Sequence, residues 1–338
     1  MMNGVEVYDK ECLDNINARI ENSSNSKLLK AYYNYTVSAT KTKSLRTRYN
    51  YVCHVDMFLN EIEKEVADIT FQDLVGYMAE KEYKKDGTKY SQSHKIGVYT
   101  ALKHLFDFLC KTNEIKENPM NNINRPTAYD SQETIKKRDN NYLDRNEIKM
   151  YIDTLKRGAG NYIARAKQEN WKERDMLIIM LFLKTGIRRS ALRKLDVDSI
   201  DLENKTLTVT DKGEKSKIRA ISDDVVELAR KWLIKREELL DGKKEVALFI
   251  SNRKTRISAN AISNLTDKYS TYIDGKKITP HKLRATYGTQ LYNETKDIVF
   301  VQGMMGHNSP KTTELYVRGN SENELKAIDI MNNVCGGF

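Results

Sequence analysis

Residues 279–284 read Thr-Pro-His-Lys-Leu-Arg, and this stretch carries the clearest local signal in the sequence. Thr279 is a residue type suited to a helix N-cap, and proline is favoured at the first helical position. We therefore predict that a helix begins at Pro280. His281 and Arg284 lie three positions apart, so they project from one face of that helix at its positive end. A His and an Arg at this spacing commonly form a surface pair, so a catalytic role for them depends on the other functional residues of the sequence.

Upstream, an arginine and a lysine occupy two marked local structures. Residues 185–188 read Thr-Gly-Ile-Arg, which places Arg188 just after a glycine break and at the start of a new helix. Strand-forming residues at 206–209 and 218–221 flank a turn at 211–213, which predicts a short hairpin with Lys212 at its tip. A lysine in a turn is ordinary when taken alone.

Downstream, a histidine and a tyrosine follow a helix that is rich in methionine. Gly306 and His307 come directly after that helix, and Tyr316 follows nine residues after His307. The chain contains 19 tyrosines, and a tyrosine more commonly packs than reacts. The six residues are informative only together, in one order and at one set of intervals.

That arrangement resembles the catalytic domain of the tyrosine recombinase (phage integrase) superfamily, which includes the Xer recombinases. In that family an Arg follows a Thr-Gly-hydrophobic turn, a Lys lies on a β-turn, and a His-x-Leu-Arg box comes later. A Leu-Gly-His element follows, matched here by Met305-Gly306-His307, and the nucleophilic Tyr comes nine residues after it. The matching catalytic residues of this chain are Arg188, Lys212, His281, Arg284, His307 and Tyr316.

The resemblance implies a fold and an activity. The expected fold is mainly α with a small antiparallel β-sheet, built from a helical N-terminal core-binding (SAM-like) domain and an α+β catalytic domain that form a C-shaped DNA clamp. The expected activity is site-specific recombination of double-stranded DNA through a 3′-phosphotyrosyl intermediate, by a homo-tetramer on DNA, with no metal or other cofactor. Integration or excision of a mobile element and Xer-like resolution both stay open, as does the DNA target sequence.

The resemblance also implies a role for each residue. Tyr316 is the expected nucleophile, while Arg188 and Arg284 hold the phosphate oxygens through forked donors. Lys212 is the expected general acid for the leaving 5′-oxygen. His281 is the expected general base or proton shuttle, and His307 donates to the phosphate.

One position departs from the family pattern. After the first arginine the family commonly reads hydrophobic-Ser-Glu, whereas this chain reads Arg189-Ser190-Ala191. In the family this glutamate normally orients the catalytic His or Arg groups without contacting the substrate itself. The resemblance therefore predicts that Ala191→Glu is tolerated or raises cleavage. Two alternative functions stay open: a type IB topoisomerase-like enzyme, and a catalytically weakened DNA-binding relative.

The first part of the chain is predicted to be helical and basic. Residues 27–117 show helical periodicity, as in the apolar series from Leu45 to Ile62. A solvated face is the alternative explanation for the charges of either helix alone, but two basic helices favour contact with DNA phosphates. The candidate DNA-binding residues are Lys41, Lys43, Arg46, Arg48, Lys89, Lys95 and Lys103.

Polar and proline-containing stretches predict the domain boundaries. The divisions are an N-terminal extension at 1–26, the DNA-binding domain at 27–126, a linker at 127–141, the catalytic domain at 142–320 and a tail helix at 321–338. Further expected elements are a short helix around Asp9–Ile20, a helix capped by Asp144, a buried helix at Arg174–Leu183 and a helical pattern from Asp223 to the end. Whether the tail helix docks on its own chain or on a neighbouring subunit stays open.

Composition narrows the class of protein. A formal net charge of +10, with 39% hydrophobic and 31% charged residues, predicts a soluble protein with a polyanionic partner. The longest apolar run, Met176–Leu183, is far shorter than the ~20 residues that cross a bilayer, so no membrane association is expected. No secretory signal is visible. Four cysteines without paired spacing argue against disulfides and zinc, and predict a cytoplasmic protein.

Overall fold

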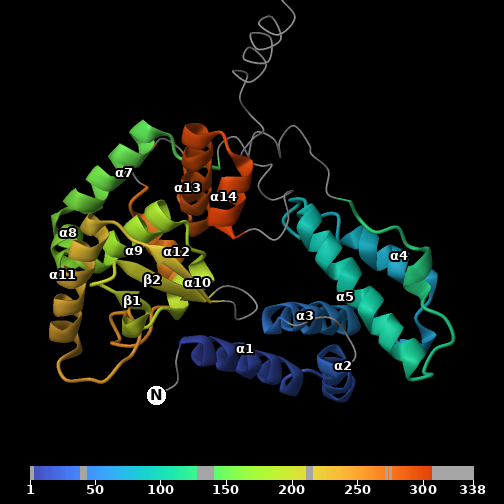
Figure 1. The fold of residues 1–338 in the computed structure, drawn as a ribbon. Coiled ribbons are helices and arrows are strands. Elements are labelled where there is room, and N and C mark those ends of the chain that lie inside the picture. Colours follow the sequence, from blue (N-terminus) through green and yellow to red (C-terminus); the bar gives the residue numbers. More distant parts are fainter. Residues whose placement is uncertain are drawn as a thin grey trace, which may run out of the picture. The chain divides into compact units, whose positions relative to one another are not determined.

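The computed structural model describes residues 4–38, 44–127, 141–210, 216–270, 273 and 276–306. Contacts divide the chain into two compact units, one within residues 4–131 and the other within residues 132–338, and each is described by itself (Figure 1). The described residues are mostly helical, and they include one three-stranded antiparallel sheet. The predicted class, mainly α with a small antiparallel sheet, is confirmed.

The first unit is a bundle of helices. Its elements are α1 (Gly4–Glu21), α2 (Ser26–Ser38), α3 (Leu45–Ile62), α4 (Phe71–Glu80) and α5 (Gln92–Lys111), with 3₁₀ turns at Val66–Asp68 and Pro119–Asn122. Helices α3 and α5 pack along each other and place Val55, Phe58, Leu102 and Phe106 in a core with no exposed surface. Burial of each such side chain contributes about 1.5–3 kcal/mol.

Helix α1 shares that core. The sequence predicts residues 1–26 as a separate extension, but α1 packs against α3 and places Ile16 and Ile20 in the core of the first unit. Asp56 on α3 is nearly buried, and its carboxylate lies 2.5 Å from Nε of Arg19 and accepts a 2.5 Å hydrogen bond from the Ser23 hydroxyl. A buried carboxylate needs such partners, so this contact fixes the end of α1 on α3.

The second unit combines helices with the sheet. Its helices are α7 (Arg145–Arg157), α8 (Tyr162–Glu169), α9 (Lys172–Thr185), α10 (Arg189–Lys194), α11 (Asp223–Leu240), α12 (Ala259–Lys268), α13 (Pro280–Thr295) and α14 (Ile298–Met305), with a 3₁₀ turn at Val197–Ser199. The strands are β1 (Ile200–Asp201), β2 (Thr206–Thr210) and β3 (Ser216–Ala220), in the order β1-β2-β3. As the sequence predicts, Asp144 caps α7, where it forms a reciprocal capping box with Glu147.

Helix α9 lies at the centre of the second core. Its side chains Leu177, Ile178, Ile179, Leu181 and Phe182 are fully buried, because α7, α11 and α13 pack around it. A helix that is apolar on nearly every side is stable in water only when neighbours cover it. The buried helix predicted at Arg174–Leu183 is therefore confirmed, and it is slightly longer than predicted.

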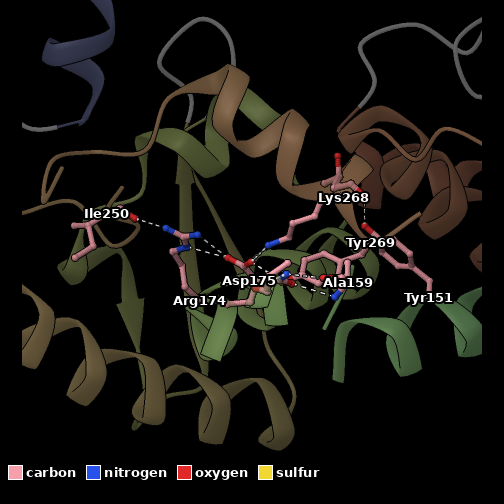
Figure 2. Close-up of polar contacts among 10 residues, drawn as sticks. Tyr151, Ala159, Arg174, Asp175, Ile250, Lys268 and Tyr269 are labelled. Atoms are coloured by element: carbon pink, nitrogen blue, oxygen red, sulfur yellow. Dashed lines mark hydrogen bonds and ion pairs between the residues drawn. The ribbon is translucent and has the colours of Figure 1, made fainter. Parts of the chain in front are cut away.

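A buried ion network fixes the beginning of α9 (Figure 2). Asp175 has no exposed surface, and its carboxylate accepts hydrogen bonds from Arg174 (2.7 Å from Nη2), Lys268 (2.9 Å) and the Tyr269 hydroxyl (2.7 Å). Arg174 also donates to the Ile250 carbonyl at 2.9 Å. Burying a charge is costly unless it is paired, so the removal of one partner would destabilise the junction of α9 with α12.

The structure differs from the predicted helical pattern after Asp223. Helix α11 ends where Asp241 and Gly242 adopt left-handed backbone, and residues 241–258 are not helical. The apolar run 247–250 is buried and bends at Leu248 and Phe249, between isolated β-bridges at Ala247 and Ile250. The Leu248 amide donates to the Leu195 carbonyl at 2.9 Å. The prediction of a continuous helical pattern is therefore wrong here, because the hydrophobicity of a short buried apolar run does not distinguish a helix from a non-helical segment. No helix in the described ranges is long and apolar enough to cross a bilayer.

Candidate active site

The helix start at residues 279–284 forms as predicted. The Thr279 hydroxyl accepts a 3.2 Å hydrogen bond from the Lys282 amide, and Pro280 is the first residue of α13. Arg284 is buried, with 5% of its surface exposed, whereas His281 is exposed. One face of α13 therefore carries an arginine in the interior and a histidine at the surface.

Two helices end close to Arg284, each with a glycine in left-handed conformation. Gly186 ends α9 with φ of 59°, and Gly306 ends α14 with φ of 61°. Gly186 is predicted from the sequence as a break, and glycine adopts such a φ at no steric cost. The last carbonyl groups of each helix lack helical donors and carry partial negative charge, which favours cations beside them.

Arg284 and Arg188 supply those cations. Arg284 donates from Nη1 to the Gly186 carbonyl and from Nη2 to the Met305 carbonyl, so one forked side chain joins the ends of α9 and α14. Arg188 precedes the first residue of α10, is partly exposed, and donates from Nη2 to the Gly306 carbonyl at 3.0 Å. The structure thus brings together two of the six candidate catalytic residues at the meeting point of two helix ends.

The two guanidinium groups and the nearby imidazole suit chemistry on an anion. Guanidinium groups bind phosphate oxygens with two parallel donors, and they stay charged at all physiological pH values. Although His281 is exposed at the surface, the surrounding protein removes part of the water from its imidazole, and this desolvation, followed by the charge of Arg284, lowers the pKa of His281. A lowered pKa favours the neutral imidazole near pH 7, and the neutral form can accept a proton.

Three candidate catalytic residues, Lys212, His307 and Tyr316, lie outside the described residues. The strands on either side of Lys212 are described, and the predicted hairpin is confirmed in them: β2 pairs antiparallel with β3, with Thr210 opposite Ser216. The predicted tail helix at 321–338 also lies outside the described residues.

Ala191 has a different environment from the one that the family pattern suggests. It lies on α10, is 2% exposed and belongs to the apolar core of the second unit. The position is therefore closely packed around a small side chain.

Sequence reasoning missed a third arginine of this site, Arg219 on β3. Its Nη1 donates to the Thr185 carbonyl at 3.1 Å and to the Met304 carbonyl at 2.8 Å. Arg219 is 9% exposed, whereas its neighbour Ile218 is 74% exposed. Apolar residues are expected to face the core, so the strand alone predicts the opposite orientation.

The register of the hairpin explains this reversal. Arg219 lies opposite Leu207, which is fully buried, and Ile218 lies opposite Thr208, which is exposed. Directly opposed residues of an antiparallel pair share one face of the sheet. Pairing β3 with the stronger apolar pattern of β2 could have identified Arg219 as an inward residue.

The candidate DNA-binding residues of the first unit differ in their surroundings. Lys41 and Lys43 lie outside the described residues. Arg46 is exposed, with its guanidinium 5.1 Å from the centre of the Tyr49 ring. Arg48 on the same helix is partly exposed.

The three candidate DNA-binding lysines on and before α5 differ in their exposure and in their polar partners. Lys89 is exposed, whereas Lys95 is 8% exposed and its ammonium lies 2.6 Å from the Glu82 carboxylate. Lys103 donates to Oδ1 of Asn121 at 2.9 Å. Lys95 is thus already neutralised, and it is the described candidate least suited to contact a phosphate.

Comparisons with known proteins agree with this geometry. The model of the phage integrase family matches residues 139–323. The tyrosine recombinase XerS of Streptococcus agalactiae serotype III (strain NEM316) is 30% identical over 304 residues, which cover 82% of this chain and 83% of that protein. The tyrosine recombinase XerC of Corynebacterium glutamicum is 31% identical over 173 residues, which cover 51% of this chain and 56% of that protein. The match to XerC thus spans little more than half of that relative's length.

A solved structure shows the same fold. The site-specific recombinase XerH, in a post-cleavage complex with palindromic difH DNA, superposes with a TM-score of 0.66 at 20% identity. The superposition covers 95% of this chain and 88% of that chain.

Proposed function

This chain belongs to the phage integrase family, and on that premise we propose that it is a site-specific DNA recombinase that cuts and rejoins strands through a 3′-phosphotyrosyl intermediate. The observation that carries the proposal is the placement of Arg188 and Arg284. Both guanidinium groups are held by carbonyls where α9 and α14 end, within the residues that the family model matches.

The two arginines suit the charge that develops during cleavage. Attack on a phosphodiester builds negative charge on the non-bridging oxygens, and fixed guanidinium donors stabilise it without reorganising. A guanidinium has five N–H donors, so the same group can bond a carbonyl that orients it and a phosphate that it binds. The carbonyl bonds hold Arg188 and Arg284 ready for this role.

The remaining steps belong to residues on neighbouring segments. The Tyr316 oxygen attacks phosphorus and forms the covalent bond as the bond from phosphorus to the 5′-oxygen breaks, so the energy of the phosphodiester is kept for rejoining. Lys212 protonates the departing 5′-oxygen, and neutral His281 accepts the tyrosine proton. His307 donates to the phosphate, and no step needs a metal ion.

We further propose how the protein meets DNA. The first unit is the DNA-binding domain, in which exposed basic residues such as Arg46 and Lys89 contact phosphates, and the two units close around the duplex as a clamp. A homo-tetramer then exchanges strands between two sites in the cytoplasm. Each phosphate contact adds a salt-dependent contribution to affinity. The topoisomerase-like alternative is not favoured, because the relatives reported above are recombinases.

Covalent capture tests the proposed function and identifies the DNA site in the same experiment. The full chain is incubated with sheared genomic DNA of the organism that carries its gene, and then denatured so that only covalent protein–DNA complexes remain. We expect DNA from one recurrent sequence, joined by its 3′-phosphate to the tryptic peptide 312–318, which contains Tyr316. EDTA leaves the yield unchanged. A strict need for a divalent metal, or attachment to another residue, contradicts the proposal.

A further inference from the structure

Arg219 lies where three segments of the site meet. It belongs to β3, the strand that follows residues 211–215, and Lys212 is one of these residues. Its two carbonyl partners are Thr185, the last residue of α9, and Met304, in the last turn of α14. The first of these helices leads to Arg188, and the second leads to His307.

The electrostatics of the contact favour a fixed arrangement. The partner carbonyls belong to helix C-termini, whose partial negative charge attracts a cation. Arg219 as a whole residue is 9% exposed, so water competes weakly for its donors. The nearby Tyr287 ring is sensitive to the same charges, because the guanidinium groups of Arg219 and Arg284 partly offset the rise that burial causes in its pKa.

We propose that Arg219 is a positioning residue that joins the β2–β3 hairpin to the ends of α9 and α14, and so places the groups that bind the scissile phosphate. This inference rests on the proposed function. Arg219 acts through Arg188 and Arg284, which donate to carbonyls of the same two helix ends. Without Arg219, the two helix ends are joined through Arg284, which bonds Gly186 and Met305, and through Arg188, which bonds Gly306, and both of these arginines must also bind the phosphate.

The geometry of the two spanning arginines differs in a way that an experiment can use. Arg219 makes both of its carbonyl bonds from one nitrogen, Nη1, whereas Arg284 uses two nitrogens. A lysine ammonium places three donors on one nitrogen, so it can reproduce the bonds of Arg219 but not the fork of Arg284. Arg219→Lys should therefore keep function where Arg284→Lys loses it.

The test uses the full chain, a nicked duplex of the site recovered by covalent capture, and four variants. Arg219→Met removes the donors and keeps an apolar stem, Arg219→Lys keeps one cationic nitrogen, and Arg284→Lys provides the contrast. Arg236→Met is the matched control, because Arg236 is 2% exposed and donates to the carbonyls of Ala247 (2.9 Å) and Glu245 (2.6 Å) in the same unit. Single-turnover cleavage, DNA affinity and amide hydrogen exchange are measured below the melting temperature of every variant.

Arg219→Met should slow cleavage about 10–100-fold, the range found for the analogous loss of a group that orients metal ligands, with little change in DNA affinity. Amides at 186–189 and 303–306 should exchange faster in this variant, and Arg236→Met should leave both cleavage and these amides unchanged. Arg219→Lys should cleave far faster than Arg284→Lys. Wild-type cleavage by folded Arg219→Met, a loss confined to DNA affinity, or equal losses in the two lysine variants overturns the inference.

Two further outcomes separate the possible failures. If the wild-type chain forms no covalent complex, the proposed function fails, and hydrogen exchange still decides whether Arg219 orders the two helix ends. If Arg219→Met does not fold, the two lysine variants test the inference: faster cleavage by Arg219→Lys than by Arg284→Lys supports it, and equal losses overturn it.

Discussion

The Tyr287 ring lies directly against Gly186, so closely that a β-carbon at Gly186 would sit 2.3 Å from Cδ1 of the ring. Gly186 also has left-handed backbone, with φ of 59°. Two independent restraints, a steric one and a conformational one, therefore require glycine at the turn that precedes Arg188. This turn sets how α9 ends and where the first arginine of the site begins.

Gly186→Ala should destabilise the protein. The left-handed backbone costs a side chain roughly 1–2 kcal/mol, and overpacking against Tyr287 adds about 1–3 kcal/mol. Urea unfolding measures the loss. Gly76→Ala on α4 is the matched control, because nothing lies within 4 Å of its added carbon and alanine favours helices. Equal stability of the two variants would show that Gly186 is not restrained.

Arg284→Lys should reduce cleavage by orders of magnitude while DNA affinity changes little. The substitution keeps the charge but loses the fork that bonds Gly186 and Met305. Single-turnover cleavage of the nicked duplex, beside a binding titration, measures both quantities. Near wild-type cleavage by the lysine variant would remove Arg284 from the site.

The structure predicts that Ala191→Glu destabilises the protein, whereas the family pattern predicts that this substitution is tolerated or raises cleavage. Ala191 is 2% exposed within the apolar core, so a carboxylate there should lower stability by more than the roughly 1–3 kcal/mol that an unpartnered neutral polar group costs. Thermal unfolding and cleavage are measured together. Ser190→Glu places the same charge on an exposed neighbour and should be tolerated. Unchanged stability with faster cleavage would instead support the family pattern at this position.

Acid should destabilise the chain partly through His54 on α3. Burial, and then the charge of His94, lower the pKa of His54 to about 4. His54 of the unfolded chain titrates near pH 6.5. The stability that comes from keeping His54 neutral in the folded protein is therefore complete above about pH 6.5 and is lost as the pH falls towards 4. His54→Gln should flatten the decline in unfolding free energy between pH 7 and pH 5, followed by circular dichroism. An unchanged slope would show that His54 does not contribute to the loss of stability in acid.

The sequence predicted those helices and strands whose ends carry residues that favour helix capping or chain turns. Thr279 caps α13 and Asp144 caps α7, because a side-chain acceptor at these positions satisfies amides that the helix leaves unpaired. The hairpin strands and the glycine break at Gly186 follow from equally local preferences. These elements supply the framework that holds Arg188 and Arg284.

The missed features depend on tertiary contacts. Arg219 faces inward because β2 fixes the buried face of β3, and because helix ends from elsewhere in the chain provide its acceptors. The run 247–250 is held by bonds such as that from the Leu248 amide to the Leu195 carbonyl, and the burial of Ala191 depends on α12 and β2, which pack against α10. No pattern within a single element carries this information.

Tyr316 is the proposed nucleophile, and the direct measurement of its role is covalent trapping on a nicked duplex of the recovered site. Tyr316→Phe removes only the hydroxyl, so folding and DNA affinity should stay near wild-type values. Tyr162→Phe is the matched control, because Tyr162 is 85% exposed on α8. We expect covalent product from the wild type and from Tyr162→Phe, and none from Tyr316→Phe. Covalent product from Tyr316→Phe would contradict the proposed mechanism.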